Sequence, residues 1–171
     1  IIVLALLVFV AVTIFKGVRI VPQGYKWIVQ RLGKYHSTLN PGLNFVIPYI
    51  DEVAYKVTTK DIVLDIPSQE VITRDNAVLL MNAVAYINLT TPEKAVYGIE
   101  NYSWAIQNLV QTSLRSIVGE MDLDDALSSR DHIKAKLKAA ISDDISDWGI
   151  TLKTVEIQDI KPSHTMQAAM E

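Results

Sequence analysis

The sequence of 171 residues contains no cysteine, and this absence removes several kinds of chemistry at once. A chain without cysteine has no disulfides, no thiolate nucleophiles, no cysteine-rich metal sites and no palmitoylation. Glycine is also scarce, and its seven copies form neither a GxGxxG fingerprint, nor a phosphate-binding loop, nor a GxSxG elbow. We therefore assign no residue to catalysis or to cofactor binding, and the sequence is not expected to encode an enzyme.

Histidine and aspartate offer no metal site either. His36, His132 and His164 are far apart, and none has a ligand partner at helical or alternating spacing. The acidic run at residues 122–125 lacks the glycine and the later glutamate of a calcium-binding loop. A helix cap at Asp122 followed by solvated charges explains this run better, so no metal is expected.

Acidic residues are rare in the first part of the chain. Residues 16–60 contain seven Lys or Arg but only two acidic residues, whereas residues 61–171 contain nine basic and seventeen acidic ones. A basic segment beside an apolar one suits anionic lipid headgroups, while the acidic remainder argues against a nucleic-acid partner. The alternative is a solvated surface on which the charges cluster by chance. The residues assigned to headgroup contact are Lys16, Arg19 and Lys34.

Residues 1–15 form an apolar run in which Thr13 is the only polar side chain. As a helix at ~1.5 Å per residue the run reaches ~22 Å, compared with a hydrocarbon core of ~30 Å. A signal peptide would need a small-residue cleavage site, which residues 16–19 do not offer. The favoured alternative is a transmembrane helix over residues 1–16 that lacks its first turn. The predicted membrane anchor consists of Ile1, Leu4, Leu7, Phe9, Ile14 and Phe15.

The basic residues that follow this run set the expected orientation. Several Lys and Arg lie within about 20 residues of the helix end, the range over which the positive-inside bias acts. We therefore expect a single-pass protein of the inner (plasma) membrane, with its body on the cytoplasmic side.

Beyond the anchor, the hydrophobic period changes to two residues, then becomes helical. The predicted strands are 25–30, 53–58, 61–66, 69–73 and 78–88, with a hairpin turn at 74–76. Helices are expected to begin near Pro92, near Ser103 and at Ser129 or Arg130, with a short turn capped by Asp122 before the last of them. A strand at 150–160 with a bulge near 153–154 closes the pattern before a further helix begins at Pro162. Strands first, helices after and a closing strand define an α+β fold.

An apolar segment at residues 43–50 departs from what a soluble surface allows. Pro41 precedes it and Pro48 divides it, which disfavours both a helix and a central strand. An apolar loop of this kind is either tucked under the sheet or inserted into an interface, and we favour membrane contact. The predicted contact residues are Leu43, Phe45, Val46, Ile47, Pro48, Tyr49 and Ile50.

Several blocks of sequence match one known family, in the same order along the chain. They are Val21–Gly24, Arg31–Tyr35, Leu39–Leu43, Ile47–Pro48, Asp65–Asn76, Leu114–Met121, Leu127–Arg130, Trp148–Ile150 and Ile157–Pro162. The block Asp65–Asn76 looks like the stomatin-type "dIPxQeviTkDN" motif. Together they resemble the SPFH (stomatin–prohibitin–flotillin–HflK/C) or Band 7 family, and within it the bacterial stomatin-like proteins of the QmcA type (paraslipins).

The resemblance implies a membrane helix followed by two small α+β subdomains of mostly antiparallel sheet with packed helices. A membrane-proximal SPFH1 subdomain would span residues 17–88, and an SPFH2 subdomain would span 89–161. A C-terminal coiled-coil helix would begin within 162–171. Because cysteine is absent, the lipid attachment used by some stomatins is excluded, and the membrane hold is expected from residues 1–15 and 43–50.

The resemblance also implies a function and a set of partners. The expected function is a non-enzymatic membrane scaffold whose copies close into a ring or cage around a membrane microdomain. The expected partners are membrane lipids, further copies of the chain, and an NfeD-type membrane protein or an FtsH-type protease. The alternative function is a regulatory subunit that modulates a membrane protease of the FtsH type. No cofactor is implied.

Overall fold

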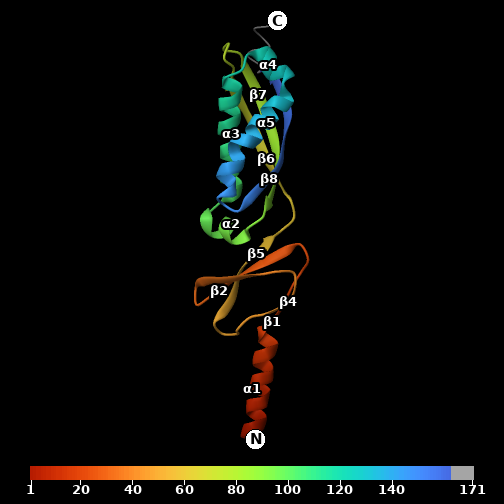
Figure 1. The fold of residues 1–171 in the computed structure, drawn as a ribbon, viewed down its shortest axis with the longest axis vertical. Coiled ribbons are helices and arrows are strands. Elements are labelled where there is room, and N and C mark those ends of the chain that lie inside the picture. Colours follow the sequence, from red (N-terminus) through yellow and green to blue (C-terminus); the bar gives the residue numbers. More distant parts are fainter. Residues whose placement is uncertain (163–171) are drawn as a thin grey trace. The chain divides into compact units, whose positions relative to one another are not determined.

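The computed structural model describes residues 1–162 and divides the chain into two compact units. The first unit is Ile1–Lys60 and the second begins at Asp61. Both units combine helix with antiparallel sheet, so the expected α+β fold is confirmed. Figure 1 shows the elements of each unit in order along the chain.

The first unit opens with helix α1 (Ile2–Gly17) and continues with five strands. They are β1 (Val18–Val21), β2 (Tyr25–Arg31), β3 (Lys34–Leu39), β4 (Gly42–Phe45) and β5 (Asp51–Thr58). Strands β1 and β4 form a two-stranded antiparallel ribbon, and β3-β2-β5 form a three-stranded sheet. A small core of Val21, Val29 and Leu39 fills this unit, with Trp27, Val46 and Val53 packed against it.

The second unit contains one three-stranded sheet with helices packed against it (Figure 1). Its strands are β6 (Ile62–Ile72), β7 (Val78–Leu89) and β8 (Ile150–Pro162), in the order β6-β7-β8. Its helices are α2 (Pro92–Gly98), α3 (Tyr102–Gly119), α4 (Leu123–Ser128) and α5 (Arg130–Ser146). Strand β7 is therefore central, as its apolar sequence indicates.

Period and pairing explain the core of the second unit. One face of β7 buries every second side chain from Leu79 to Leu89. Helix α5 buries an apolar stripe at four-residue spacing, consisting of Ile133, Leu137, Ile141 and Ile145. The β7–β8 register shifts where Tyr86 pairs with Thr154 and Ile87 pairs with Leu152, which leaves Lys153 as an extra residue. This confirms the bulge expected near residues 153–154.

The structural division of the chain differs from the subdomain boundary expected between residues 88 and 89. Strands β6 and β7 pair with each other, and β7 pairs with β8, so residues 62–89 belong to the same sheet as the C-terminal strand. The units consequently separate at Lys60, before β6 begins. The expected helix start at Pro162 is wrong, because this residue ends strand β8 opposite Leu79. The rest of the expected coiled-coil segment lies outside the described residues.

Gly149 occupies a position that demands glycine. Its φ of +69° lies in the left-handed region, and a Cβ atom there would lie 2.8 Å from Cβ of Lys94 and closer still to the backbone oxygen of Thr91. The Thr91 amide also donates to the Gly149 carbonyl oxygen at 2.9 Å, so this backbone approach connects the start of α2 to the start of β8.

We predict that Gly149→Ala lowers the free energy of unfolding by about 1–3 kcal/mol, because alanine adds a left-handed strain and a backbone clash. Gly98→Ala is the matched control, since its Cβ would meet only Cδ1 of Trp148, at an ordinary 4.0 Å. Chemical denaturation of both variants measures the effect. Equal stability of the two variants would contradict the role assigned to Gly149.

Candidate functional site: an apolar surface on the first unit

Helix α1 exposes apolar side chains around its whole circumference. The six predicted anchor residues Ile1, Leu4, Leu7, Phe9, Ile14 and Phe15 are all exposed. The hydroxyl of Thr13 donates to the carbonyl oxygen of Phe9 at 2.8 Å, so the one polar side chain in this run is satisfied within the helix. A helix that is apolar all round and internally hydrogen-bonded suits a hydrocarbon environment.

The prediction of a transmembrane helix over residues 1–16 needs a correction. These residues do form a helix, but within the described residues 1–162 no helix is long and apolar enough to cross a membrane. The physical reason is length, because the 16 residues of α1 rise only ~24 Å against a hydrocarbon core of ~30 Å.

The ribbon of β1 and β4 presents a second apolar surface. Directly opposed residues of an antiparallel pair share a face, and Ile20 is opposite Leu43 while Val18 is opposite Phe45. Ile20, Leu43 and Phe45 remain 69%, 62% and 71% exposed, whereas Val21 on the opposite face is 2% exposed in the core. The ribbon therefore has one face packed into the protein and one apolar face directed outward.

This ribbon corrects the expectation of an irregular loop over residues 43–50. Residues 43–45 belong to strand β4, because β4 ends before Pro48 and begins after Pro41, so neither proline interrupts it. The remaining residues 46–50 do form a connection. Ile47, Tyr49 and Ile50 are exposed in it, while Val46 packs against the small core and Pro48 is half-buried.

Backbone contacts hold the connection against the end of α1. The Val46 amide donates to the Gly17 carbonyl oxygen at 2.7 Å, and a Cβ atom on Gly17 would lie 2.7 Å from the Val46 carbonyl oxygen. Gly17 is also the only buried residue of α1. The close approach of these two backbones places residues 46–50 directly beside the C-terminal end of the apolar helix.

A partly buried ion pair fixes the other end of the connection. Arg31 donates through Nε and Nη2 to the two carboxylate oxygens of Asp51, at 2.7 and 3.1 Å. The Asp51 side chain is 2% exposed, and its carboxylate also accepts from the Ile47 amide at 2.9 Å. The hydrogen bond from Arg31, together with the one from Ile47, lowers the pKa of Asp51 to about 2 despite the opposing effect of burial.

The predicted headgroup residues lie at different places on this unit. The ammonium of Lys16 lies 5.8 Å from the ring centroid of Tyr49, and Nη1 of Arg19 donates to the Lys16 carbonyl oxygen at 2.9 Å. Lys34 is exposed at the start of β3, directly after the turn that joins it to β2. The structure thus brings Lys16 and Arg19 together at the end of α1, with Lys34 on the separate β2–β3 hairpin.

Sequence reasoning missed two exposed apolar residues of this surface. Ile20 lies in a strand of four residues, which is too short to show a clear alternation of apolar and polar residues. Its pairing with Leu43 depends on the structure of the ribbon and cannot be read from the local sequence. Leu32 is 80% exposed at the tip of the β2–β3 turn with a φ of 53°, and its amide donates to the Ile50 carbonyl oxygen at 3.1 Å. An apolar residue before glycine in a turn was the available signal.

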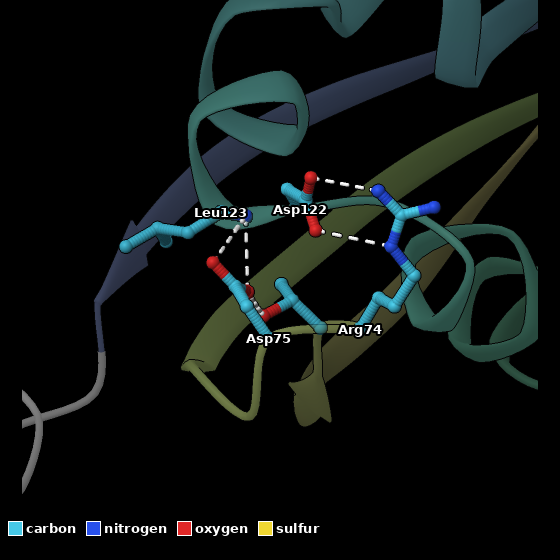
Figure 2. A network of polar contacts seen from close by, with 5 residues as sticks. Arg74, Asp75, Asp122 and Leu123 are labelled. Carbon is cyan, nitrogen blue, oxygen red and sulfur yellow. Dashed lines mark hydrogen bonds and ion pairs between the residues drawn. The ribbon is translucent and has the colours of Figure 1, made fainter.

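A polar network in the second unit has a structural role (Figure 2). Nε and Nη2 of Arg74, in the turn between β6 and β7, donate to the carboxylate of Asp122, and the carboxylate of Asp75 accepts from the Leu123 amide at the start of α4. The hydroxyl of Thr73 donates to Asp75, and this contact is the main cause that lowers the pKa of the Asp75 carboxyl. The network connects the β6–β7 turn to the α3–α4 junction.

Each of these contacts joins residues that lie far apart in sequence or within the β6–β7 turn, which fits a role in holding the fold. The residues that the structure describes include no group of three potential metal ligands. Asp122 precedes α4 as predicted, but its side chain pairs with Arg74 and makes no cap hydrogen bond.

The architecture is that of an α+β protein: the first unit contains an apolar helix and antiparallel strands, and the second contains an antiparallel sheet with packed helices. The family model for the SPFH domain / Band 7 family matches residues 19–171, and the chain belongs to this family. It is 41% identical over 157 residues to an uncharacterized protein of Methanocaldococcus jannaschii, covering 92% of this chain and 78% of that protein.

Two further relatives extend the comparison to bacteria and to human mitochondria. An uncharacterized protein of Mycobacterium tuberculosis is 37% identical over 166 residues, which cover 97% of this chain and 44% of the relative. Human mitochondrial stomatin-like protein 2 is 36% identical over 151 residues, which cover 88% of this chain and 42% of the relative. The chain therefore spans less than half the length of these two proteins.

We predict that Asp51→Asn loosens residues 46–50, because it removes the charged partner of Arg31 and weakens the hydrogen bond to Ile47. Hydrogen exchange of the amides of residues 46–51 should accelerate by about tenfold or more, the effect of losing a charge-assisted hydrogen bond. Glu52→Gln is the matched control, since it neutralises the neighbouring carboxylate and leaves the Arg31–Asp51 pair intact. Unchanged exchange in Asp51→Asn would contradict the anchoring role.

The same pair predicts a pH dependence. Because the folded pKa of Asp51 lies near 2, below its ordinary value of 3.8, the pair stabilises the fold fully above about pH 4 and less as the pH falls toward 2. The melting temperature should therefore fall more steeply between pH 5 and pH 2 for the parent protein than for Asp51→Asn. Parallel curves would show that Asp51 contributes nothing in this window.

Proposed function

We propose that the chain is the SPFH part of a non-enzymatic membrane scaffold that holds the bilayer through its first unit. The observation that carries this proposal is the double apolar surface of that unit, made by α1 and by the outward face of the β1–β4 ribbon with residues 46–50. Apolar side chains of this number, exposed on a single small unit, mark a surface that binds another apolar phase. Family membership and the human stomatin-like relative support the same proposal.

The two apolar surfaces act together in this proposal. The Gly17–Val46 and Arg31–Asp51 contacts keep residues 46–50 beside the end of α1. Once the helix enters the bilayer, the ribbon is presented to the same bilayer at high effective concentration, so its binding adds to that of the helix. The surplus of basic residues in this unit favours the anionic cytoplasmic leaflet of an inner (plasma) membrane, with the body of the protein on that side.

The assembly proposed for the scaffold is a closed ring or cage of identical copies around a membrane microdomain. Copies that share one bilayer meet repeatedly, and a head-to-tail contact that closes on itself leaves no free edge. Native mass measurement or electron microscopy of the full-length protein in mild detergent is expected to give one large closed oligomer. A monodisperse monomer would end this part of the proposal.

The membrane surface is tested by substitution on the ribbon. We expect Leu43→Asp together with Phe45→Asp to weaken partitioning onto liposomes by at least tenfold, since each lost apolar contact is worth roughly 1.5–3 kcal/mol when fully made. Trp104→Asp is the matched control, because Trp104 is 64% exposed in the second unit. Liposome flotation over a range of lipid concentrations gives the partition coefficients, and unchanged partitioning of the ribbon variant would remove the ribbon from the membrane surface.

A second proposal is that the scaffold binds and restrains a membrane protein partner, such as an FtsH-type protease or an NfeD-type protein. It is supported by the exposed Trp104, which borders a hollow of about 530 Å³ with Ile99, Glu100, Asn101 and Ala105. Exposed tryptophan is typical of residues that dominate protein interfaces. A pull-down that retrieves stoichiometric protease with the parent chain and not with Trp104→Ala favours regulation, whereas retrieval of only lipids and further copies favours the scaffold alone.

A further inference from the structure

A cleft of about 490 Å³ lies where α1 meets the first strands of the unit. Its lining is almost entirely apolar and consists of Ile14, Phe15, Val18, Arg19, Ile20 and Trp27. A second hollow of about 540 Å³, lined by Ala11, Val12, Phe15, Lys16 and Arg19, shares Phe15 and Arg19 with the first. One guanidinium therefore borders two apolar hollows that lie along the same helix.

The hydrogen bonds of Arg19 leave one edge of its guanidinium available. Nη1 donates to the Lys16 carbonyl oxygen at 2.9 Å and to the Val18 carbonyl oxygen at 3.4 Å. A guanidinium has five N–H donors, so the edge formed by Nε and Nη2 keeps three of them. This edge is the one that engages a carboxylate or a phosphate in two parallel hydrogen bonds.

Two other arginines show how this protein satisfies the same edge internally. Arg31 uses Nε and Nη2 on the carboxylate of Asp51, and Arg74 uses the same two atoms on the carboxylate of Asp122. Within residues 1–162, no carboxylate takes this place beside Arg19. Arg19 is only half-exposed, and a partly buried charge without a counter-ion is costly.

The sequence around Arg19 cannot supply the missing anion. The first 50 residues contain no aspartate or glutamate, and the first acidic residue, Asp51, is already engaged by Arg31. Lys16 adds a second positive charge to the hollow that Arg19 borders. The partner that fits has a negative group for the guanidinium and an apolar chain for the cleft.

We propose that this cleft binds one anionic phospholipid. The phosphate accepts two hydrogen bonds from Nε and Nη2 of Arg19, with Lys16 nearby, and an acyl chain lies in the apolar cleft against Phe15 and Trp27. The proposal rests on the membrane association proposed above and adds to it a defined lipid class at a defined place. It distinguishes Arg19 from the other basic residues of the unit, which attract anionic lipid only through their charge.

The test measures binding of the full chain to vesicles of phosphatidylcholine alone and to vesicles that also contain phosphatidylglycerol. The preference is the ratio of the affinity for vesicles with phosphatidylglycerol to the affinity for vesicles of phosphatidylcholine alone. Arg19→Gln should lower this ratio by about tenfold, the loss expected for a charge-assisted bidentate contact. Lys136→Gln removes one positive charge from an exposed position of the second unit and should retain the preference. Arg19→Lys, which keeps the charge but not the fork, should resemble Arg19→Gln.

A local readout accompanies the binding curves. Phosphatidylglycerol with brominated acyl chains should quench the fluorescence of Trp27, measured as the difference between the parent chain and Trp27→Phe. Arg19→Gln should reduce this quenching and Lys136→Gln should not. Inorganic phosphate is included as a competitor, and protection of the site by millimolar phosphate alone would assign it to free phosphate and overturn the lipid proposal.

The outcomes separate the two proposals. Equal losses in Arg19→Gln and Lys136→Gln, or no loss in either, overturn the cleft and leave membrane association standing on diffuse charge and apolar contact. Failure of the parent chain to bind phosphatidylcholine vesicles, combined with binding of phosphatidylglycerol in detergent micelles that depends on Arg19, overturns the membrane scaffold and keeps the cleft. Failure of both measurements overturns both.

Discussion

Apolar surface without a protein partner is the constraint on which the first unit depends. Helix α1 and the outward face of the ribbon expose leucine, isoleucine and phenylalanine side chains that no described residue covers. The same unit buries few apolar side chains, namely Val21, Ile28, Val29, Leu39 and Val57, while most of the large apolar side chains of α1 and of the ribbon stay exposed. Water is a poor solvent for this exposed surface, because each exposed large apolar side chain forgoes roughly 1.5–3 kcal/mol of burial.

The rest of the first unit is organised to keep that surface in place. The ribbon can present an apolar face outward only if its other face is packed against the protein. Val21 is buried in the core on that packed face, and its neighbour Ile20 is exposed on the outward face. Gly17 permits the helix to end against the backbone of Val46, where any side chain would meet a carbonyl oxygen. Asp51 then holds the far end of the connection through Arg31 and the Ile47 amide. Polar chemistry in this unit thus serves to position apolar side chains.

Local sequence pattern predicted most of the helices and strands but not their long-range partners. The four-residue spacing from Ile133 to Ile145 specifies α5, and the phase change around Lys153 specifies the bulge in β8, because both signals lie within one element. Strand β4 has only four residues and pairs with an equally short β1, so neither shows a period of its own. Its prolines flank the strand, and sequence reasoning read them as evidence for a loop.

The boundary between units was harder still, because it depends on which strands pair. Residues 62–89 join a sheet completed by residues 150–162, and nothing near residue 88 signals that connection. The anchor illustrates a different limit. Its apolar composition was plain from the sequence and its helix formed as predicted, yet the described helix is too short to cross a bilayer.

The distribution of charge in this chain matters more than its net value. Of the nineteen acidic residues only Asp51 and Glu52 precede residue 61, so the first unit has far more cations than it has anions to pair with them. The hydrogen-bond partners of the arginine side chains show the consequence of this charge distribution. Arg31 and Arg74 each close their fork on a carboxylate of their own unit, which makes them part of the fold. Arg19 has the same chemistry, but within residues 1–162 no carboxylate closes its fork. A partly buried charge favours a counter-ion, and the apolar walls around Arg19 suit the proposed anion that is attached to an acyl chain.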